Sequence, residues 1–455
     1  MGAPRGLVIA APASGHGKTT VTLGLLRALA RSGRRVAGVK IGPDYIDPAF
    51  HAAACGRPCP NLDPWAMRPA THAAVLASLA DADPVVAEGV MGLYDGAADG
   101  TGSTADLAAE TRWPVVLVAD VKGQGASLAA LARGFASHDP RLRLAGVIAN
   151  RTGGERHRRL LAEALEGVGI PLLGCLPRDD ALALPSRHLG LVQAGEHPDL
   201  ERFLDAAADR VAEALDLDAL ARLAAPLTDR PVTPSPDAPG LPPPGQRIAV
   251  ARDEAFAFLY PHLLDGWRAA GAELAPFSPL ADEAPDPAAD AIFLPGGYPE
   301  LRADRLAAAT RFLDGLRAAA ARGAVVYGEC GGYMVLGQGL EDADGRRHAM
   351  AGLLPVETSF AEPRLHLGYR RLTLRVATPF GPAGARLAGH EFHYARQTGP
   401  AAPDPLFEAE DATGRALGAI GARSGTVFGS YAHLVDRADG ARHAKRTKDH
   451  DGTSG

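Results

Sequence analysis

Short apolar runs alternate with amphipathic segments along the first half of the chain. Runs of β-branched and aliphatic residues are typical of buried strands, and apolar residues three and four positions apart are typical of helices. The pattern predicts strands at 6–11, 35–39, 85–88, 115–119, 144–149 and 171–174, and helices at 18–31, 70–80, 126–136, 155–167 and 199–216. This alternation indicates an α/β domain with a parallel sheet.

The second half of the chain repeats the alternation. It predicts strands near 247–251, 272–276, 291–295 and 324–328, and helices near 261–270, 303–321 and 331–337. Later apolar runs, at 369–376 and 425–429, have no helical segment between them and indicate mixed or antiparallel strands.

A proline-rich stretch separates the two halves. Eight prolines lie between Pro226 and Pro244, and proline fixes φ and lacks an amide hydrogen, which excludes a helix or an inner strand. We therefore predict a first domain at 1–224, a linker at 225–245, a second domain at 246–436 and a polar, disordered tail at 437–455. The alternative is a long surface loop within one domain.

Composition narrows the classes of protein. The 455 residues carry a formal net charge of −6, which argues against a generally basic nucleic-acid binder. No stretch reaches the roughly 18 uncharged apolar residues that a membrane span needs. The four cysteines match neither a metal motif nor a disulfide framework, so a reducing cytoplasm is the expected location. The oligomeric state stays open, with a homodimer among the options.

A glycine-rich segment follows the first predicted strand and precedes the first predicted helix. Residues 11–20 read APASGHGKTT, and this context is that of a P-loop, whose backbone amides hold phosphate. We expect Lys18 to meet the β- and γ-phosphates of ATP and the Thr19 hydroxyl to hold Mg²⁺. Pro12 stands where the motif usually has glycine, and the alternative is a turn that packs a helix on a strand. The expected nucleotide contacts are Ser14, Gly15, Gly17, Lys18, Thr19 and Thr20.

Two further polar clusters follow predicted strands. Residues 40–48 read KIGPDYIDP and residues 88–96 read EGVMGLYDG. Because the carboxyl ends of parallel strands meet at one edge of a sheet, both clusters should lie beside the P-loop. Their carboxylates and lysine suit Mg²⁺ coordination and charge neutralisation in phosphoryl transfer. Either cluster alone would be an ordinary polar loop, and their convergence favours a site.

The second half contains a candidate nucleophile. Residues 325–334 read VVYGECGGYM, a strand, a turn and a helix in which glycines permit a sharp elbow that exposes Cys330. The helix start should lower the pKa of this thiol. His433 is the candidate base, and the amides of Gly296 and Gly297 are candidates for an oxyanion hole. A buried structural cysteine is the alternative, which we retain for Cys55, Cys59 and Cys175.

These motifs, in this order, resemble the a,c-diamide synthases of the cobalamin pathway, which act on cobyrinic or hydrogenobyrinic acid. The resemblance covers residues 6 to about 436. It implies a dethiobiotin-synthetase-like ATPase domain followed by a flavodoxin-like class I glutamine amidotransferase domain. It also implies that ATP activates a carboxylate as an acyl phosphate and that ammonia from glutamine then forms the amide, across an interdomain tunnel.

The resemblance assigns roles to matching positions. It implies phosphate contacts for Lys18 and Lys40, and Leu176–Asp179 resembles the nucleotide loop after a strand. The implied magnesium ligands are Thr19, Asp44 and Glu88, the implied tetrapyrrole contacts are Tyr45, Asp47 and Asp95, and the implied base-reading residue is Asn150. Class I amidotransferases usually carry a glutamate two residues after the histidine, where this chain has Val435. The residue that orients His433 stays open between Asp436 and Glu329.

Several alternatives remain. Residues 390–394 read HEFHY, a spacing that suggests a metal pair but lacks an apparent third ligand, so we expect an interdomain or substrate-facing role. A different tetrapyrrole, such as nickel-sirohydrochlorin, is a rival substrate. A P-loop partitioning or scaffold ATPase without amide chemistry is a rival function, against which the glutaminase half argues. The sequence does not separate metal-free from cobalt-containing corrin, and we favour hydrogenobyrinic acid slightly.

Overall fold

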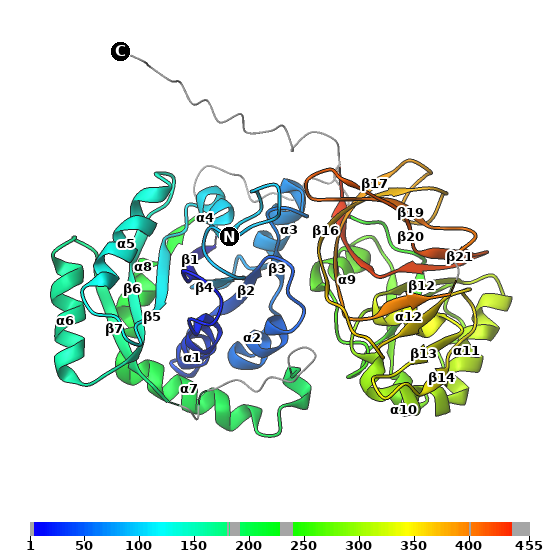
Figure 1. Cartoon of the computed structure of the whole chain (residues 1–455), viewed down its shortest axis with the longest axis horizontal. Helices are drawn as coiled ribbons and strands as arrows, with labels where there is room; N and C mark the ends of the chain where they lie inside the picture. The colour runs from blue at the N-terminus through cyan, green and yellow to red at the C-terminus, as the bar shows by residue number, and fades with distance from the viewer. Residues whose placement is uncertain (1–3, 180–181, 183–191, 228–239, 400–401, 439–455) are drawn as a thin grey trace, which may run out of the picture.

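A computed structural model describes residues 4–179, 182, 192–227, 240–399 and 402–438, which form two lobes (Figure 1). The predicted linker is described only at its two ends, and the predicted tail lies outside the described residues from 439 onward. Within the described residues, no helix is both long enough and apolar enough to cross a membrane.

The first lobe is built on an eight-stranded sheet with the order β3-β2-β4-β1-β5-β6-β7, in which β8 pairs antiparallel with β1. The seven strands of the main path are parallel, as predicted. Because β2 and β4 lie next to one another and β4 lies next to β1, the loops after these three strands meet at one edge. The strands are β1 (Arg5–Ala10), β2 (Ala37–Ile41), β3 (Asn61–Leu62), β4 (Val85–Gly89), β5 (Val115–Asp120), β6 (Leu144–Thr152), β7 (Leu172–Pro177) and β8 (Ala225–Pro226).

Helices cover this sheet, and α1 packs against α7 so closely that a Cβ on Gly24 would lie 2.5 Å from the Ala207 carbonyl oxygen. The prediction of α1 at 18–31 is confirmed. Three helices, α2, α4 and α8, were not predicted. The helices are α1 (Lys18–Arg31), α2 (Asp47–Cys55), α3 (Pro69–Ser78), α4 (Thr104–Thr111), α5 (Ser127–His138), α6 (Glu155–Glu166), α7 (Leu200–Ala214) and α8 (Leu217–Leu223), with a 3₁₀ turn, η2, at Ala194–Glu196.

The second lobe contains a six-stranded sheet with the order β10-β9-β11-β12-β22-β21, parallel except for β21. The predicted helix at 303–321 is interrupted at Ala309, whose ψ of 74° is not helical. The strands are β9 (Arg247–Ala251), β10 (Glu273–Phe277), β11 (Ala291–Leu294), β12 (Val325–Glu329), β21 (Ala422–Ser424) and β22 (Val427–Ser430). The helices are α9 (Pro261–Ala269), η3 (Pro279–Ala281), η4 (Pro299–Arg302), α10 (Ala303–Ala308), α11 (Thr310–Ala321) and α12 (Gly331–Leu336).

Two smaller sheets complete the second lobe. An antiparallel five-stranded sheet has the order β20-β19-β16-β17-β23, with β16 (His366–Leu374), β17 (Arg386–His393), β19 (Phe407–Asp411), β20 (Ala416–Ile420) and β23 (Ala432–Arg437). A four-stranded sheet has the order β14-β13-β15-β18, with β13 (Gly339–Glu341), β14 (Arg347–Ala349), β15 (Glu357–Ser359) and β18 (Arg396–Thr398). The register of β17 places His390 opposite both Tyr369 and His433.

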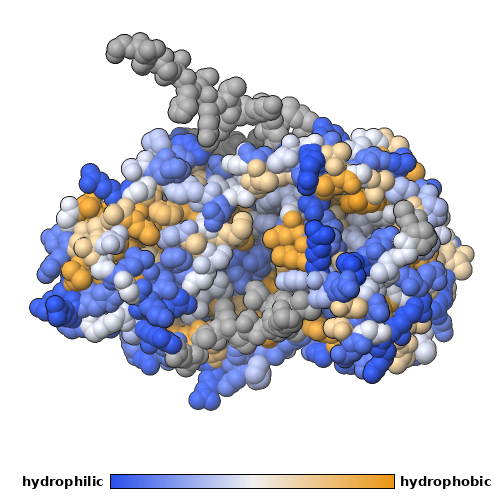
Figure 2. All heavy atoms as spheres, in the orientation of Figure 1, coloured by the Kyte–Doolittle hydropathy of each residue, from blue (hydrophilic) through white to orange (hydrophobic). Residues whose placement is uncertain are grey.

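The two lobes pack against each other through buried polar and aromatic side chains. The Trp65 ring stacks on Tyr369, with ring centroids 4.4 Å apart, and the Tyr369 hydroxyl donates to Asp63. Asp436 accepts hydrogen bonds from Arg68 and Thr71 of the first lobe. Polar side chains cover most of the face in Figure 2, and a group of hydrophobic side chains lies near the junction of the lobes.

Candidate functional site

The segment after β1 forms a loop that ends at the start of α1. Gly15 and Gly17 have φ values of 84° and 87°, in the left-handed region that side chains with a Cβ rarely adopt. Lys18 donates from Nζ to the Met91 carbonyl oxygen at 2.5 Å. Burial lowers the pKa of Lys18. The loop thus presents backbone amides and a buried lysine at one helix start, as a phosphate site requires.

A cluster of carboxylates surrounds Lys40 beside this loop. Its Nζ lies 2.5 Å from Asp47, 3.0 Å from Glu88 and 3.5 Å from Asp44. The Thr19 hydroxyl donates to Glu88 at 2.7 Å. Burial by itself lowers the pKa of Lys40, but the three carboxylates outweigh it and hold that pKa well above its usual value. The clusters at 40–48 and 88–96 therefore meet at the P-loop edge, as predicted.

The two aspartates of this cluster have different surroundings. Asp47, which the resemblance placed at the tetrapyrrole, lies 3.3 Å from the Thr19 hydroxyl, and burial raises its pKa to about 6. Asp44 instead accepts the backbone amides of Ile46 and Asp47 through Oδ1. Thr19, Asp47 and Glu88, with Asp44 at the side, form an oxygen-donor set that fits Mg²⁺. Mg²⁺ bound there would neutralise phosphate charge.

Glu88 has a further partner, which the sequence did not predict. His51, on α2, lies with Nε2 2.7 Å from Glu88 Oε2, and its Nδ1 lies 3.4 Å from the Cys59 sulfur. Burial alone would raise the pKa of Glu88, but Lys40 and His51 lower it. No local signal in the sequence marks His51. It lies on the same face as Asp47, four residues earlier, only if the segment is a helix, and α2 was not predicted.

A cavity of about 420 Å³ opens beside the P-loop, within the range of small-molecule sites. Asn150 and the loop at 176–179 line it together with Gly17 and Thr20. The Asn150 amide donates to the His16 carbonyl oxygen at 2.9 Å, and a Cβ on Gly17 would lie 2.2 Å from the same amide. The structure thus gathers the predicted base-reading asparagine and the predicted nucleotide loop beside the phosphate loop.

Asp95 shapes the loop after β4. Its carboxylate accepts the Gly92 amide at 2.8 Å, and the neighbouring Leu93 amide donates to Ala11 of the P-loop at 2.8 Å. Asp95 therefore holds the loop that packs on the phosphate loop, and its implied contact with the tetrapyrrole stays a prediction.

Cys330 occupies the sharp turn between β12 and α12. Its φ of 46° is a strained value for a residue with a side chain, and such strain is common at nucleophile elbows. The thiol donates to the Phe392 carbonyl oxygen at 3.5 Å. Burial raises the pKa of Cys330, while hydrogen bonds from the Gly331 and Gly297 amides act in the opposite direction. The elbow is present, but burial outweighs the helix start that we expected to lower the thiol pKa.

His433 lies beside the cysteine, on β23. A Cβ on Gly296 would lie 2.2 Å from His433 Cε1 and 3.1 Å from Cys330 Cβ, so the three residues converge. Burial lowers the pKa of His433 to about 3, with smaller contributions from His390 and His393. The centre therefore combines a neutral imidazole, a neutral thiol and the Gly297 amide that was predicted for the oxyanion hole.

Replacing Gly296 with alanine is expected to abolish glutamine hydrolysis, because the added methyl would displace His433 from Cys330. Ammonia-dependent amidation should survive, since the P-loop edge does not contact Gly296. Gly266→Ala is the matched control, because that helical glycine has no atom within 4 Å of an added Cβ. Steady-state glutaminase rates would check the prediction, and near-normal hydrolysis by the Gly296 variant would contradict it.

A side chain from the first lobe covers the catalytic histidine candidate. Tyr45 stacks on His433 with ring centroids 4.3 Å apart and an interplanar angle of 27°. Its hydroxyl lies 3.3 Å from His390 Nδ1 and accepts from the Tyr260 hydroxyl at 3.1 Å. The resemblance implied a tetrapyrrole contact for Tyr45, and the structure places the ring against the cysteine centre, 7% exposed.

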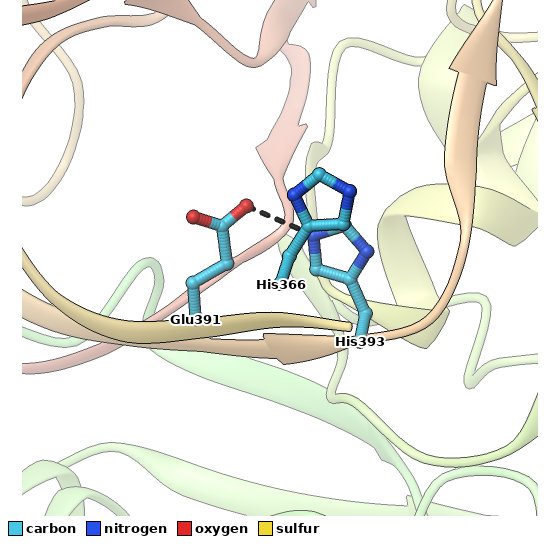
Figure 3. Close-up of side chains that lie close together, drawn as sticks. All are labelled: His366, Glu391 and His393. Atoms are coloured by element: carbon cyan, nitrogen blue, oxygen red, sulfur yellow. Dashed lines mark hydrogen bonds and ion pairs between the residues drawn. The ribbon is translucent and has the colours of Figure 1, made fainter. Parts of the chain in front are cut away.

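The HEFHY segment gains a third potential ligand in the structure. Ligand atoms of His366, Glu391 and His393 lie within 4.8 Å of one another (Figure 3). However, Glu391 contacts Arg370 at 2.5 Å and His393 at 2.8 Å, and the His366 and His393 rings stack 4.7 Å apart. Burial alone would raise the pKa of Glu391, but His393 and Arg370 lower it to about 2. The cluster is therefore already charge-balanced, which fits a structural role beside Cys330.

Comparison with known proteins agrees with this two-part arrangement. Residues 7–192 match the CobQ/CobB/MinD/ParA nucleotide binding domain, and residues 247–440 match the CobB/CobQ-like glutamine amidotransferase domain. Among solved structures, PurLQS from Thermotoga maritima aligns at 19% identity, over 42% of this chain and 87% of its own. The TM-score of this alignment is 0.29.

Curated relatives extend the similarity to nearly the whole chain. The hydrogenobyrinate a,c-diamide synthase of Sinorhizobium sp is 57% identical over 440 residues, which covers 96% of this chain and all of that protein. Proteins of the same name from Rhizobium meliloti (strain 1021) and Mesorhizobium japonicum are 56% and 53% identical, covering 95% of this chain and 99% of each. On this identity and coverage, the chain belongs to the hydrogenobyrinate a,c-diamide synthase family.

Proposed function

We propose that this protein uses ATP and glutamine to amidate the c and then the a carboxylate of hydrogenobyrinic acid or cobyrinic acid, in cobalamin biosynthesis. The observation that carries the proposal is the juxtaposition in one chain of a P-loop carboxylate cluster and a cysteine–histidine centre, with Tyr45 between them. The activity named for the relatives, hydrogenobyrinate a,c-diamide synthase, supports hydrogenobyrinate over nickel-sirohydrochlorin as the substrate. The cysteine elbow argues against a partitioning ATPase.

In the first lobe, the substrate carboxylate attacks the γ-phosphorus of ATP, and ADP leaves. Lys18 and Lys40 are placed to offset the charge that develops on the transferred phosphoryl group, which is the main contribution a protein makes to this step. We propose that Asn150 and the loop at 176–179 hold the base in the cavity. Ammonia then attacks the acyl phosphate, and phosphate leaves from the tetrahedral intermediate.

In the second lobe, His433 removes the proton from the Cys330 thiol as the sulfur attacks the side-chain amide of glutamine. The Gly297 amide, which hydrogen-bonds the sulfur, is placed to bind the oxyanion, with Gly296 as its neighbour. The protonated imidazole then donates to the leaving ammonia, and water hydrolyses the thioester to glutamate. Both groups start neutral in the buried centre, so the proton transfer creates the nucleophile only when the substrate is present.

The conditions of the reaction follow from the same residues. We propose that Mg²⁺ accompanies ATP at Thr19, Glu88 and the neighbouring aspartates. The four cysteines are free thiols, which supports action in the reducing cytoplasm. A homodimer, and the domain boundaries given above, stay predictions.

Tyr45 connects the two sites, because it follows Asp44 in the loop after β2 and its ring covers His433. Ammonia released at Cys330 has to reach the P-loop edge unprotonated. Replacing Tyr45 with alanine is therefore expected to release more glutamate per amide formed, since water would enter where the ring now lies. Tyr45→Phe keeps the stacked ring and should stay closer to the normal ratio. Parallel assays of glutamate and product measure this ratio, and an unchanged ratio in Tyr45→Ala would contradict the prediction.

The proposed function is tested with purified protein, ATP, Mg²⁺ and glutamine. Hydrogenobyrinic acid, cobyrinic acid and nickel-sirohydrochlorin are supplied separately, and mass spectrometry counts the amides formed. Two amides on a corrin, with the c-monoamide appearing first, are expected. Turnover of nickel-sirohydrochlorin alone would overturn the substrate assignment, and ATP hydrolysis without amide formation from any of the three would overturn the proposed reaction.

A further inference from the structure

The imidazole of His433 has no visible orienting partner. Neither ring nitrogen makes a hydrogen bond among the described residues, although the side chain is fully buried. A histidine base needs its second nitrogen held by a neighbouring group, so that the correct tautomer faces the nucleophile. Val435, where class I amidotransferases usually have a glutamate, is apolar and fully buried. Something else must orient this ring.

Glu329 is the carboxylate that faces His433. Its Oε2 lies 3.8 Å from His433 Nδ1, and the side chain is 2% exposed. The other oxygen, Oε1, accepts from the Tyr327 hydroxyl at 2.7 Å and from the Leu434 amide at 2.9 Å. These two bonds fix the carboxylate between β12 and β23 and leave Oε2 directed at the imidazole. A shift of less than 1 Å would bring the pair into hydrogen-bond distance.

The competing carboxylates are engaged elsewhere. Asp436 accepts hydrogen bonds from Arg68 and Thr71 of the first lobe and from its neighbour's amide at Arg437. Glu391 is held by Arg370 and His393. Of the two candidates that the sequence left open, the contacts therefore favour Glu329 over Asp436.

We propose that Glu329 is the positioning residue of the glutaminase centre and accepts a hydrogen bond from His433 Nδ1 during the reaction. The inference rests on the glutaminase activity proposed above. It assigns the third member of the centre to the residue directly before the nucleophile, on β12, instead of the position two residues after the histidine. His433 Nε2 is then free to take the Cys330 proton.

The protonation state of Glu329 should make the rate of glutamine hydrolysis depend on pH. Burial raises the pKa of Glu329 to about 8. A protonated Glu329 would donate to Nδ1 and leave the imidazole hydrogen on Nε2, where it blocks the base. The ionised carboxylate accepts from Nδ1 and frees Nε2, so glutamine hydrolysis should rise as the pH rises through about 8. The other titratable groups nearest Glu329 are Tyr45, Tyr260, Tyr327 and Cys330, and burial raises the pKa of each, so none of them should ionise in this range.

The test compares Glu329→Gln with Tyr327→Phe. Glutamine is isosteric but cannot ionise, and we expect the glutaminase kcat of Glu329→Gln to fall by about 10⁴-fold, as when other triads lose their orienting carboxylate. The KM for glutamine and the ammonia-dependent amidation should stay near normal, and the limb that ascends through pH 8 should disappear. Tyr327→Phe removes one hydrogen bond to the same carboxylate without removing the charge. Because that hydrogen bond lowers the pKa of Glu329, the ascending limb should persist in Tyr327→Phe and move to higher pH, with a much smaller loss of kcat than in Glu329→Gln.

Three outcomes would overturn the proposal. The first is a Glu329→Gln variant that retains glutaminase kcat within a few-fold, and the second is one that retains the ascending limb. The third needs no variant, since a wild-type glutaminase kcat that falls steadily with rising pH, with no ascending limb, contradicts a base that works only beside an ionised carboxylate, even if the substituted protein misfolds. Ammonia-dependent activity reports on folding of the variant. If the wild type hydrolyses no glutamine at any pH, the proposed function itself fails, which is a different result.

Discussion

Replacing Cys330 with alanine is expected to abolish glutamine-dependent amidation and leave ammonia-dependent amidation close to the wild-type rate. The sulfur is the only group at the elbow that can form the thioester, so we expect a loss of about 10⁴-fold or more, as when other nucleophiles are removed. The synthetase half should continue to work, because its candidate residues lie on the first lobe around Lys40. Amide formation from glutamine and from ammonium chloride, measured side by side, separates the two activities.

The matched control is Cys175→Ser, which changes a half-buried thiol on β7. Cys175 does not line the cavity beside the P-loop, and both activities should persist. Alanine also removes the Cys330 hydrogen bond to the Phe392 carbonyl, so a thermal melt should accompany the assay. Glutamine-dependent amidation that survives in Cys330→Ala would show that another residue releases the ammonia.

The residues at the edge of the first sheet could be predicted because the motifs that place them there are local in sequence. A strand, a glycine-rich turn and a helix are consecutive in sequence, and parallel strands place their following loops on one side. Lys18, Lys40 and Glu88 therefore come together as expected. The sequence could not rank Asp44 against Asp47, because that depends on where α2 begins. The helix starts at Asp47 and turns its carboxylate toward Thr19.

The contacts between the lobes were not predictable in this way. Tyr45 reaches His433 across 388 positions, and Arg68 reaches Asp436 across 368. The pattern of apolar and polar residues does not predict such pairs, because they depend on how the surfaces of the two folded lobes pack together. The strands β17 and β23 of the antiparallel sheet were not predicted. Their apolar and polar residues do not alternate regularly, because they carry the buried polar residues His390 and His433. Functional side chains inside strands weaken the pattern that identifies strands.

The thiol pKa shows a similar limit. The sequence places Cys330 at a helix start, which alone would lower the thiol pKa. However, α12 has only six residues, and Cys330 is 2% exposed. Removing water penalises the thiolate more than a short helix stabilises it. Burial depends on the packing of Tyr45 and β17 over the centre, which the local motif does not specify.

Replacing Lys18 with methionine is expected to abolish amidation with both glutamine and ammonia while glutamine hydrolysis continues. Methionine preserves most of the buried side-chain volume but removes the ammonium that now donates to the Met91 carbonyl. Loss of one preorganised charge at a developing phosphoryl oxyanion costs about 10²–10³-fold in rate, so both routes through the acyl phosphate should fall together.

Lys18→Arg is the companion variant, since it keeps the charge but changes its reach, and it should recover part of the ATP-dependent rate. Both ATP-dependent amidation and glutamate release from glutamine should be measured in the same preparations. A variant that still releases glutamate is folded, so its loss of amidation reports on phosphoryl transfer. The pattern is the reverse of that expected for Cys330→Ala, in which only the glutamine route fails. If Lys18→Met kept ammonia-dependent amidation above about one-tenth of the wild-type rate, less than the loss that a phosphate-binding charge causes, the loop after β1 would not be the ATP site. In that case the carboxylate cluster around Lys40 would have to activate the substrate without it.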